Sequence, residues 1–244
     1  MNTPINTPIS TSINTPINTP FNTHMIKRLV VKDWYLQRGA IVPYLGWGAL
    51  ALTLLALGGE YWFFAGSILL LTLLIAKGIH LAMATVIEER TGQTLSFVMS
   101  LPISPMEYTI AKVLANMLLF LTAWMALSIG TIAVIAGREA VPDGLIPFTA
   151  VILVDIFVGY CLILGVALVT ESQAWTIWSI VVTNLLFQAV LYYVSHIPTV
   201  AIEMKGAEVV WSRPVLLVLL AEAAAIVLTL AITFYLRSRK TDFL

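Results

Sequence analysis

The chain has 244 residues, of which 59% are hydrophobic and only 11% are charged, and 13 basic residues balance 13 acidic ones. Soluble domains average about 25% charged residues, so this composition excludes an ordinary water-soluble globular protein. The neutral balance also lacks the basic excess of a nucleic-acid-binding protein, and no nucleic-acid partner is expected. The composition predicts a polytopic membrane protein.

The first 24 residues are of low complexity. The tetrad Asn-Thr-Pro-Ile occurs at 2–5, 6–9 and 14–17. The prolines at 4, 8, 16 and 20 block a helix, and these residues offer no apolar face to bury. We expect a disordered tail over residues 1–24 and a single membrane domain over residues 25–244, with Met25 as a candidate start of the functional chain.

Six apolar stretches follow, each longer than the roughly 17–20 residues that cross a bilayer. They predict an all-α polytopic fold with six transmembrane helices and no soluble domain, at residues 39–59, 61–87, 113–137, 144–170, 172–195 and 214–236. Residues 26–38 combine apolar and basic side chains. They form either an amphipathic interfacial helix or the basic flank of the first span, and the pattern alone leaves both readings open.

The connection between spans two and three, residues 88–107, is polar but patterned. Leu95, Val98 and Met99 fall on one face of a helix. Ser104 and Glu107 then have the spacing of a capping box, with proline at the first helical position. This pattern predicts a short helix across the ends of spans two and three. The connection at 196–213 is also long enough for a short helix.

Basic residues are distributed unevenly between the two ends of the predicted spans. Nine Lys and Arg residues lie on the side of the termini and three on the other side, with Lys77 inside a span. The positive-inside rule therefore predicts that both termini and the 88–107 segment are cytoplasmic.

Three charged residues interrupt the apolar spans: Lys77 in span two, Asp155 in span four and Glu222 in span six. A carboxylate at such depth is costly and is by default a functional candidate. The alternative is a structural role, as a hydrogen-bonding group or in an ion pair such as Asp155 with Lys77.

No catalytic or nucleotide-binding motif occurs in the sequence. A P-loop is absent, so the chain is not expected to bind ATP in that way, and the H-E-x-x-H and G-x-S-x-G motifs are absent too. His24, His80 and His196 fall in different regions, and Cys161 is the only cysteine. We expect neither a metal site nor a cofactor, and we do not expect this chain to be an enzyme.

The 88–112 region resembles the signature of ABC transporter permeases of the type-2 exporter family. The matching residues are Glu88 or Glu89, Thr94-Leu95, Val98, Leu101-Pro102-Ile103-Ser104, Glu107-Tyr108 and Ala111-Lys112. One departure is Gln93, where the family usually has glycine; here Gly92 comes one place earlier.

The resemblance implies a permease whose 88–107 segment is a coupling helix that docks on a separate ATP-binding subunit. The coupling residues it implies are Glu88, Glu89, Thr94, Leu95, Val98, Met99 and Leu101. It also implies pairing with a second permease copy, as a homodimer, or with a paralogue, location in the cytoplasmic membrane, and export of a cargo that the sequence does not name.

Three other functions compete with this reading. An ion-coupled secondary transporter would use Asp155 and Glu222, although spans one to three and four to six show no mirrored motif. An intramembrane enzyme would need a catalytic constellation, which the sequence does not supply. A non-transporting assembly or immunity protein would share the topology but need no ATPase.

The predicted orientation can be tested by cysteine accessibility in a Cys161→Ala background. We expect Lys205→Cys to react with a membrane-impermeant maleimide added to intact cells, and Gln93→Cys to react only after the membrane is opened. The reverse pattern would show that the termini lie outside.

Overall fold

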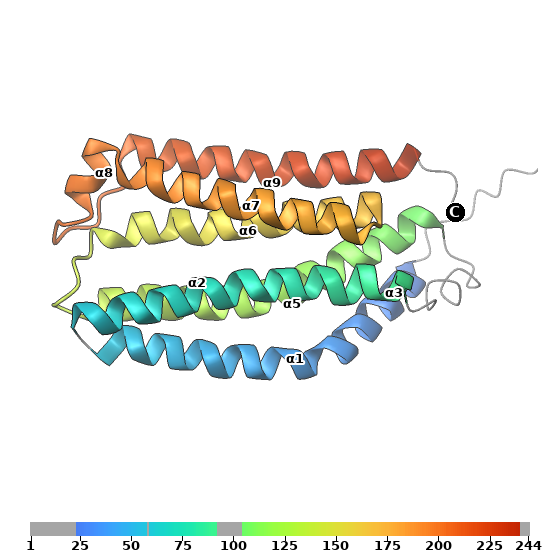
Figure 1. Ribbon diagram of the computed structural model, residues 1–244, viewed down its shortest axis with the longest axis horizontal. Coiled ribbons are helices and arrows are strands. Elements are labelled where there is room, and N and C mark those ends of the chain that lie inside the picture. Colours follow the sequence, from blue (N-terminus) through green and yellow to red (C-terminus); the bar gives the residue numbers. More distant parts are fainter. Residues whose placement is uncertain (1–22, 58, 92–103, 240–244) are drawn as a thin grey trace, which may run out of the picture.

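The computed structural model describes residues 23–57, 59–91 and 104–239. Its elements are all helical, and no strand occurs within these residues (Figure 1). In chain order they are α1 (Thr23–Leu57), α2 (Glu60–Ala82), the π-helical turn η1 (Met83–Ile87), α3 (Glu88–Thr91), α5 (Pro105–Ala136), α6 (Leu145–Thr170), α7 (Gln173–Ser195), α8 (Pro198–Glu203) and α9 (Arg213–Arg239).

Six of these helices, α1, α2, α5, α6, α7 and α9, are long and apolar enough to cross a membrane, which confirms the predicted all-α, six-span class. The second candidate span runs without a break from α2 through η1 as far as Ile87. The tail predicted for residues 1–24 lies outside the described residues except at its end, because α1 already begins at Thr23.

The structure joins residues 26–38 to the first span as one continuous helix of 35 residues. The start of this helix is anchored by side-chain packing. Ile26 and Leu29 are buried against Tyr108 and Ala111 of α5, whereas Trp34 remains 38% exposed. The segment is therefore the first part of α1 rather than a separate interfacial helix.

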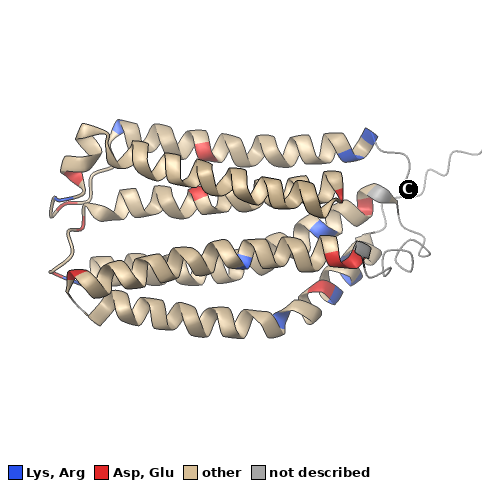
Figure 2. Cartoon of the chain, in the orientation of Figure 1, with Lys and Arg blue, Asp and Glu red and all other residues tan. Residues whose placement is uncertain are grey.

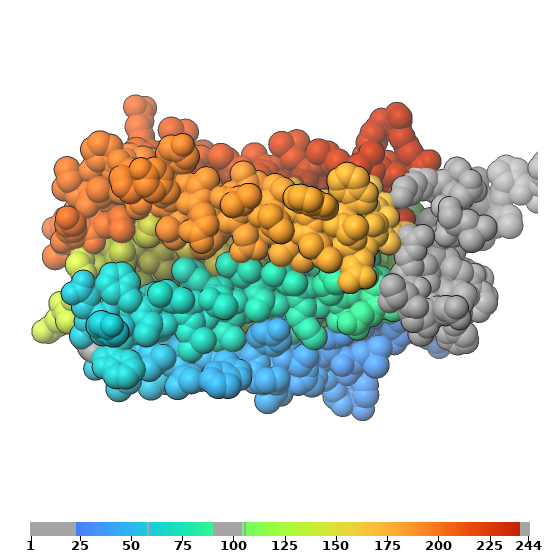
Figure 3. All heavy atoms as spheres, in the orientation of Figure 1, coloured from blue at the N-terminus to red at the C-terminus, as the bar shows by residue number. Residues whose placement is uncertain are grey.

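Two groups of three helices make up the bundle, α1 with α2 and α5, and α6 with α7 and α9 (Figure 1). Helix α6 packs against both groups, and 67% of its most apolar stretch is buried, compared with 11% for α9. The side of the bundle formed by α1, α2 and α7 is visible in Figure 3. The apolar outer faces of α7 and α9 are what a lipid-facing surface requires.

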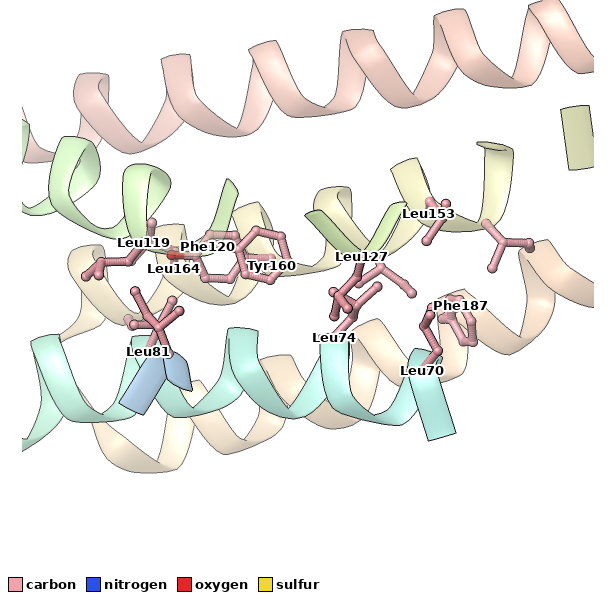
Figure 4. Close-up of a cluster of buried hydrophobic side chains, with 14 of the residues drawn as sticks. Leu70, Leu74, Leu81, Leu119, Phe120, Leu127, Leu153, Tyr160, Leu164 and Phe187 are labelled. Atoms are coloured by element: carbon pink, nitrogen blue, oxygen red, sulfur yellow. The ribbon is translucent and has the colours of Figure 1, made fainter. Parts of the chain in front are cut away.

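The core lies where α2, α5 and α6 meet, and Figure 4 shows its side chains. Leu74 and Leu81 of α2 are almost fully buried, as are Leu119 and Phe120 of α5. The rings of Phe120 and Tyr160 stack with centroids 4.0 Å apart. This contact joins the two groups of helices within the core of the bundle.

The start of α1, α3, the start of α5 and the end of α9 lie together at one end of the bundle, which we call the terminal end (Figure 1). Figure 2 shows charged residues gathered mainly at the two ends, with few between them. Helix α8 lies at the opposite end, where a short helix was predicted in the 196–213 connection.

The predicted capping box at the start of α5 is confirmed. The Glu107 backbone N–H donates to Ser104 Oγ at 3.2 Å, and the Ser104 backbone N–H donates to Glu107 Oε2 at 2.8 Å. These bonds satisfy amides that the helix itself leaves unpaired and fix where α5 begins.

Helices α1 and α2 approach each other closely at Gly66. A Cβ atom there would lie 2.7 Å from the backbone oxygen of Ala51 and 2.7 Å from the backbone nitrogen of Leu55. Both obstacles are backbone atoms, which cannot rotate away as a side chain can. Glycine is thus required at this crossing by sterics, not by its own backbone angles.

We therefore expect Gly66→Ala to destabilise the protein by about 1–3 kcal/mol, the usual range for overpacking. Alanine in an open helical position normally stabilises by about 0.5–1 kcal/mol relative to glycine. Gly46→Ala in α1 is the matched control, because nothing lies within 4 Å of its added methyl. Thermal unfolding of both purified variants in detergent checks this; equal midpoints would contradict the close approach.

Candidate functional site at the terminal end

Only two of the residues predicted to couple the chain to a partner lie in the described part of the structure. Glu88 and Glu89 form α3, where Glu88 is exposed and Glu89 is half-buried. The other five lie outside the described residues: Thr94, Leu95, Val98, Met99 and Leu101. What the structure does show is how the two flanks of that segment are held.

A buried ion network holds these flanks together. Lys112 of α5 places its ammonium 2.7 Å from Asp33 Oδ2 of α1 and 2.7 Å from Glu89 Oε2 of α3. The side chain of Lys112 is only 2% exposed, and that of Asp33 only 4%. Lys32 reaches the same two carboxylates from the surface, at 2.8 Å from Glu89 and 3.3 Å from Asp33.

Tyr108 completes the network from one helical turn before Lys112. Its hydroxyl donates to Glu89 Oε2 at 3.2 Å, and its ring is buried. Burial by itself would raise the pKa of Glu89, but Lys112 and Lys32 outweigh that effect and hold the pKa below its usual value. Glu89 is therefore charged near neutral pH and remains bound to both lysines.

The residues that resembled a family signature thus have a direct physical role in this chain. Glu89 is separated from Tyr108 and Lys112 by the 92–103 segment, and it contacts both of them in the structure. They lie on both sides of residues 92–103, and Asp33 ties them to α1. Because Glu89 is occupied by internal partners, its charge is not simply presented to a docking subunit.

A polar cluster continues the network toward the middle of the bundle. Asn116 lies one turn beyond Lys112 and donates to its backbone carbonyl at 2.9 Å. The Thr85 hydroxyl of η1 lies 2.9 Å from Asn116 Oδ1, and the Tyr160 hydroxyl of α6 lies 3.5 Å from the same oxygen. This cluster connects η1 and α5 to the central helix α6.

A second ion pair closes the terminal end on the other group of helices. Arg237 of α9 is 5% exposed and pairs with Glu171, the residue that ends α6. Its Nε also donates to Thr109 Oγ1 of α5 at 3.2 Å. Because Thr109 follows Tyr108 directly, the Lys112 ion network and the Arg237–Glu171 pair both contact the first turns of α5.

The ion pairs at this end of the molecule hold helices together. The ion-paired groups here are Lys32, Asp33, Glu89, Lys112, Glu171 and Arg237. No group of three or more His, Cys, Asp or Glu residues that could hold a metal occurs among the described residues. The arrangement of ion pairs can transmit a displacement. A movement of α3 or of the start of α5 acts on α1, and through Arg237 on α9.

Lys77, one of the three intramembrane charges, faces α1. Lys77 is 1% exposed and lies 4.8 Å from the ring centroid of Tyr44 on α1, with no hydrogen-bond partner for its nitrogen in the described structure. The ion pair suggested for Asp155 and Lys77 is therefore not formed. The physical reason is direction, because Lys77 points to α1 while Asp155 lies on α6.

Sequence reasoning missed Asp33, the second anchor of the network, and the Arg237–Glu171 pair. Asp33 carried one signal, since it is the only acidic residue in the basic stretch 26–38. Its partner Lys112 is 79 residues away, so only the packing of α1 on α5 identifies the contact.

No protein-family model, curated protein or solved structure matches this chain. The class of protein is consequently defined by the fold itself, an all-helical bundle whose six apolar helices fit a multi-pass membrane protein.

Removing Lys112 should be far more damaging than removing Lys32. We expect Lys112→Met to cost about 3–5 kcal/mol, because it removes the buried cation and leaves Asp33 and Glu89 with only the partly exposed Lys32. Lys32→Met should cost at most about 1 kcal/mol, since that lysine is 38% exposed and water screens its charge. Thermal unfolding in detergent compares them, and equal losses would show that the buried pairs do not hold the fold.

Proposed function

We propose that this chain is the membrane-spanning permease subunit of an ABC-type transporter, an exporter, driven by ATP hydrolysis on a separate subunit. The observation that supports it most is the ion network formed by Asp33, Glu89, Tyr108 and Lys112. It fixes both flanks of residues 92–103 to the membrane helices, as a segment that receives force from a partner would need.

In this proposal the partner binds residues 92–103 and moves them as its ATP sites close. Helix α3 and the first turns of α5 would follow, because the network joins them with contacts of 2.7 Å. Packed helices respond to such a push as rigid bodies that tilt or slide, not by bending locally. The result would be a change in how the two groups of three helices meet around α6.

The orientation belongs to the same proposal. Nine of the Lys and Arg residues lie at the terminal end in the sequence-based topology, which supports placing that end in the cytoplasm, where ATP is available. The chain would reside in the cytoplasmic membrane and pair with a second permease, either an identical copy or a paralogue. The exposed apolar faces of α7 and α9 offer surface for lipid and for that second permease.

One observation favours a second candidate, an ion-coupled secondary transporter. Glu222 is 6% exposed, and neither of its carboxylate oxygens has a hydrogen-bond partner in the described structure. A purely structural carboxylate would be expected to have one. Co-purification of an ATP-binding subunit distinguishes the permease from this candidate and from a non-transporting assembly protein.

The docking proposal is tested by changing the apolar face of the 92–103 segment. Leu95→Asp should abolish association with an ATP-binding subunit at any salt concentration, because a buried apolar anchor holds a complex. Glu88→Lys should weaken association in a salt-sensitive way, because charges at a rim tune encounter. Affinity purification of the tagged chain from its native membranes, with photolabelling of the bound subunit by azido-ATP, measures both effects.

The matched control is Val210→Asp, an equivalent change at an exposed position of the opposite end. It should leave association and ATP hydrolysis unchanged. If Leu95→Asp also retains the azido-ATP-labelled partner, or if no such partner accompanies the unmodified chain, the permease proposal is wrong.

A further inference from the structure

A large apolar pocket lies between the two groups of three helices. Its volume is about 390 Å³, and it is lined by Phe63 and Ile68 of α2 and by Phe148 of α6, among others. Leu145, the first residue of α6, and Met204, which directly follows α8, place it toward the end of the bundle that holds α8. An apolar cavity of about 150 Å³ already takes up benzene. This pocket therefore has room for a longer apolar ligand.

The lining of this pocket offers water few partners. None of its lining side chains is charged, and those that carry a hydroxyl are Ser67, Thr131 and Thr149. Ser67 donates to the Phe63 carbonyl of its own helix at 2.8 Å, and Thr131 donates to the Leu127 carbonyl at 2.8 Å. A buried water molecule typically makes about three hydrogen bonds, and apolar cavities stay dry. Water is therefore a poor occupant.

An empty pocket of this size is also unfavourable. The side chains around a void lose the dispersion contacts that a neighbouring atom would supply. Protein interiors are otherwise packed as densely as organic crystals. A flexible hydrocarbon restores these contacts and requires no hydrogen bond.

The pocket reaches from the surface of the bundle to its core. Phe64 and Ile68 line it and are 57% and 65% exposed, whereas Leu70 and Leu153 line it and are each 2% exposed. In Figure 3 atoms of α6 are visible between α2 and α7 toward this end of the bundle. Because α2 and α7 are both long and apolar enough to cross a membrane, the mouth of the pocket faces the hydrocarbon of the bilayer.

We propose that this pocket takes up one acyl chain of a membrane phospholipid, which enters between α2 and α7 while its headgroup stays at the membrane surface. The bilayer supplies such chains directly at the mouth. A polar or charged ligand is disfavoured, because it would lose its hydration without gaining partners. The site does not depend on the proposed ATPase partner, because the membrane helices themselves supply its lining.

Photo-crosslinking in a bilayer tests this proposal. The purified chain is placed in nanodiscs that contain a phosphatidylcholine with a diazirine on one acyl chain, then illuminated, digested and mapped by mass spectrometry. Lipid around the bundle labels exposed side chains such as Leu220 of α9, which is 66% exposed. Ile152 lines the pocket and is 4% exposed, so its labelling reports a chain inside the pocket. We expect both positions to be labelled.

A variant that fills the pocket assigns the label to it. Thr149→Phe places a ring in the space beside α6, and we expect it to abolish labelling of Ile152 while labelling of Leu220 stays unchanged. Thr122→Phe is the matched control, since Thr122 lies on an exposed face of α5 outside the pocket. It should leave both labels intact. Ser67→Phe fills the pocket from α2 and keeps the test informative if Thr149→Phe fails to fold.

Three results would overturn the proposal. They are the absence of label at Ile152 in the unmodified chain, a label there that persists in both filled variants, and labelling of Ile152 by a free diazirine fatty acid but not by the phospholipid. The last result would assign the pocket to a free apolar solute. None of these outcomes bears on association with an ATP-binding subunit, so the two proposals fail independently.

Discussion

The architecture of the terminal end depends on one ammonium group, that of Lys112, held between Asp33 and Glu89. A buried ion pair of this kind adds little net stability compared with well-packed apolar side chains, but removing one partner is very unfavourable. In this protein the ion pair mainly holds three helices in fixed positions relative to one another. It joins α1, α3 and α5 at one point, and the Ser104–Glu107 cap fixes where α5 starts relative to that point.

The charged residues of the molecule therefore fall into two groups. At the terminal end, charges are paired and the helices are fixed to one another. Deeper in the bundle, Lys77 and Glu222 are buried without hydrogen-bond partners in the described residues, and Asp155 borders a small pocket. The ion pairs therefore hold the helices together at the terminal end, whereas the charges without hydrogen-bond partners lie deeper among the helices.

The sequence allowed the six helices to be predicted because length and hydrophobicity are local properties. The capping box was predictable for the same reason, since Ser104 and Glu107 are three residues apart. Asp33 could not be paired with Lys112 from sequence, because the contact depends on which helices pack together across 79 residues. The direction of Lys77 was equally hidden, since both α1 and α6 pack against α2 and periodicity does not say which of them it faces.

The π-helical turn η1 determines the direction in which the side chains of α3 point. A π-helical turn accommodates one residue more than an α-helical turn, and one residue corresponds to about 100° of rotation about the helix axis. The side chains of α3 are therefore rotated by roughly that angle from where an uninterrupted α2 would have carried them. Deleting one residue from 83–87 would let this turn close as an ordinary α-helical turn with the same total rotation, so Glu89 would still face Lys112. Residues 83–87 are thus the place where the chain can lose one residue and keep the ion network, whereas a deletion in the α-helical turns of α2 beside them would rotate Glu89 by about 100° away from Lys112.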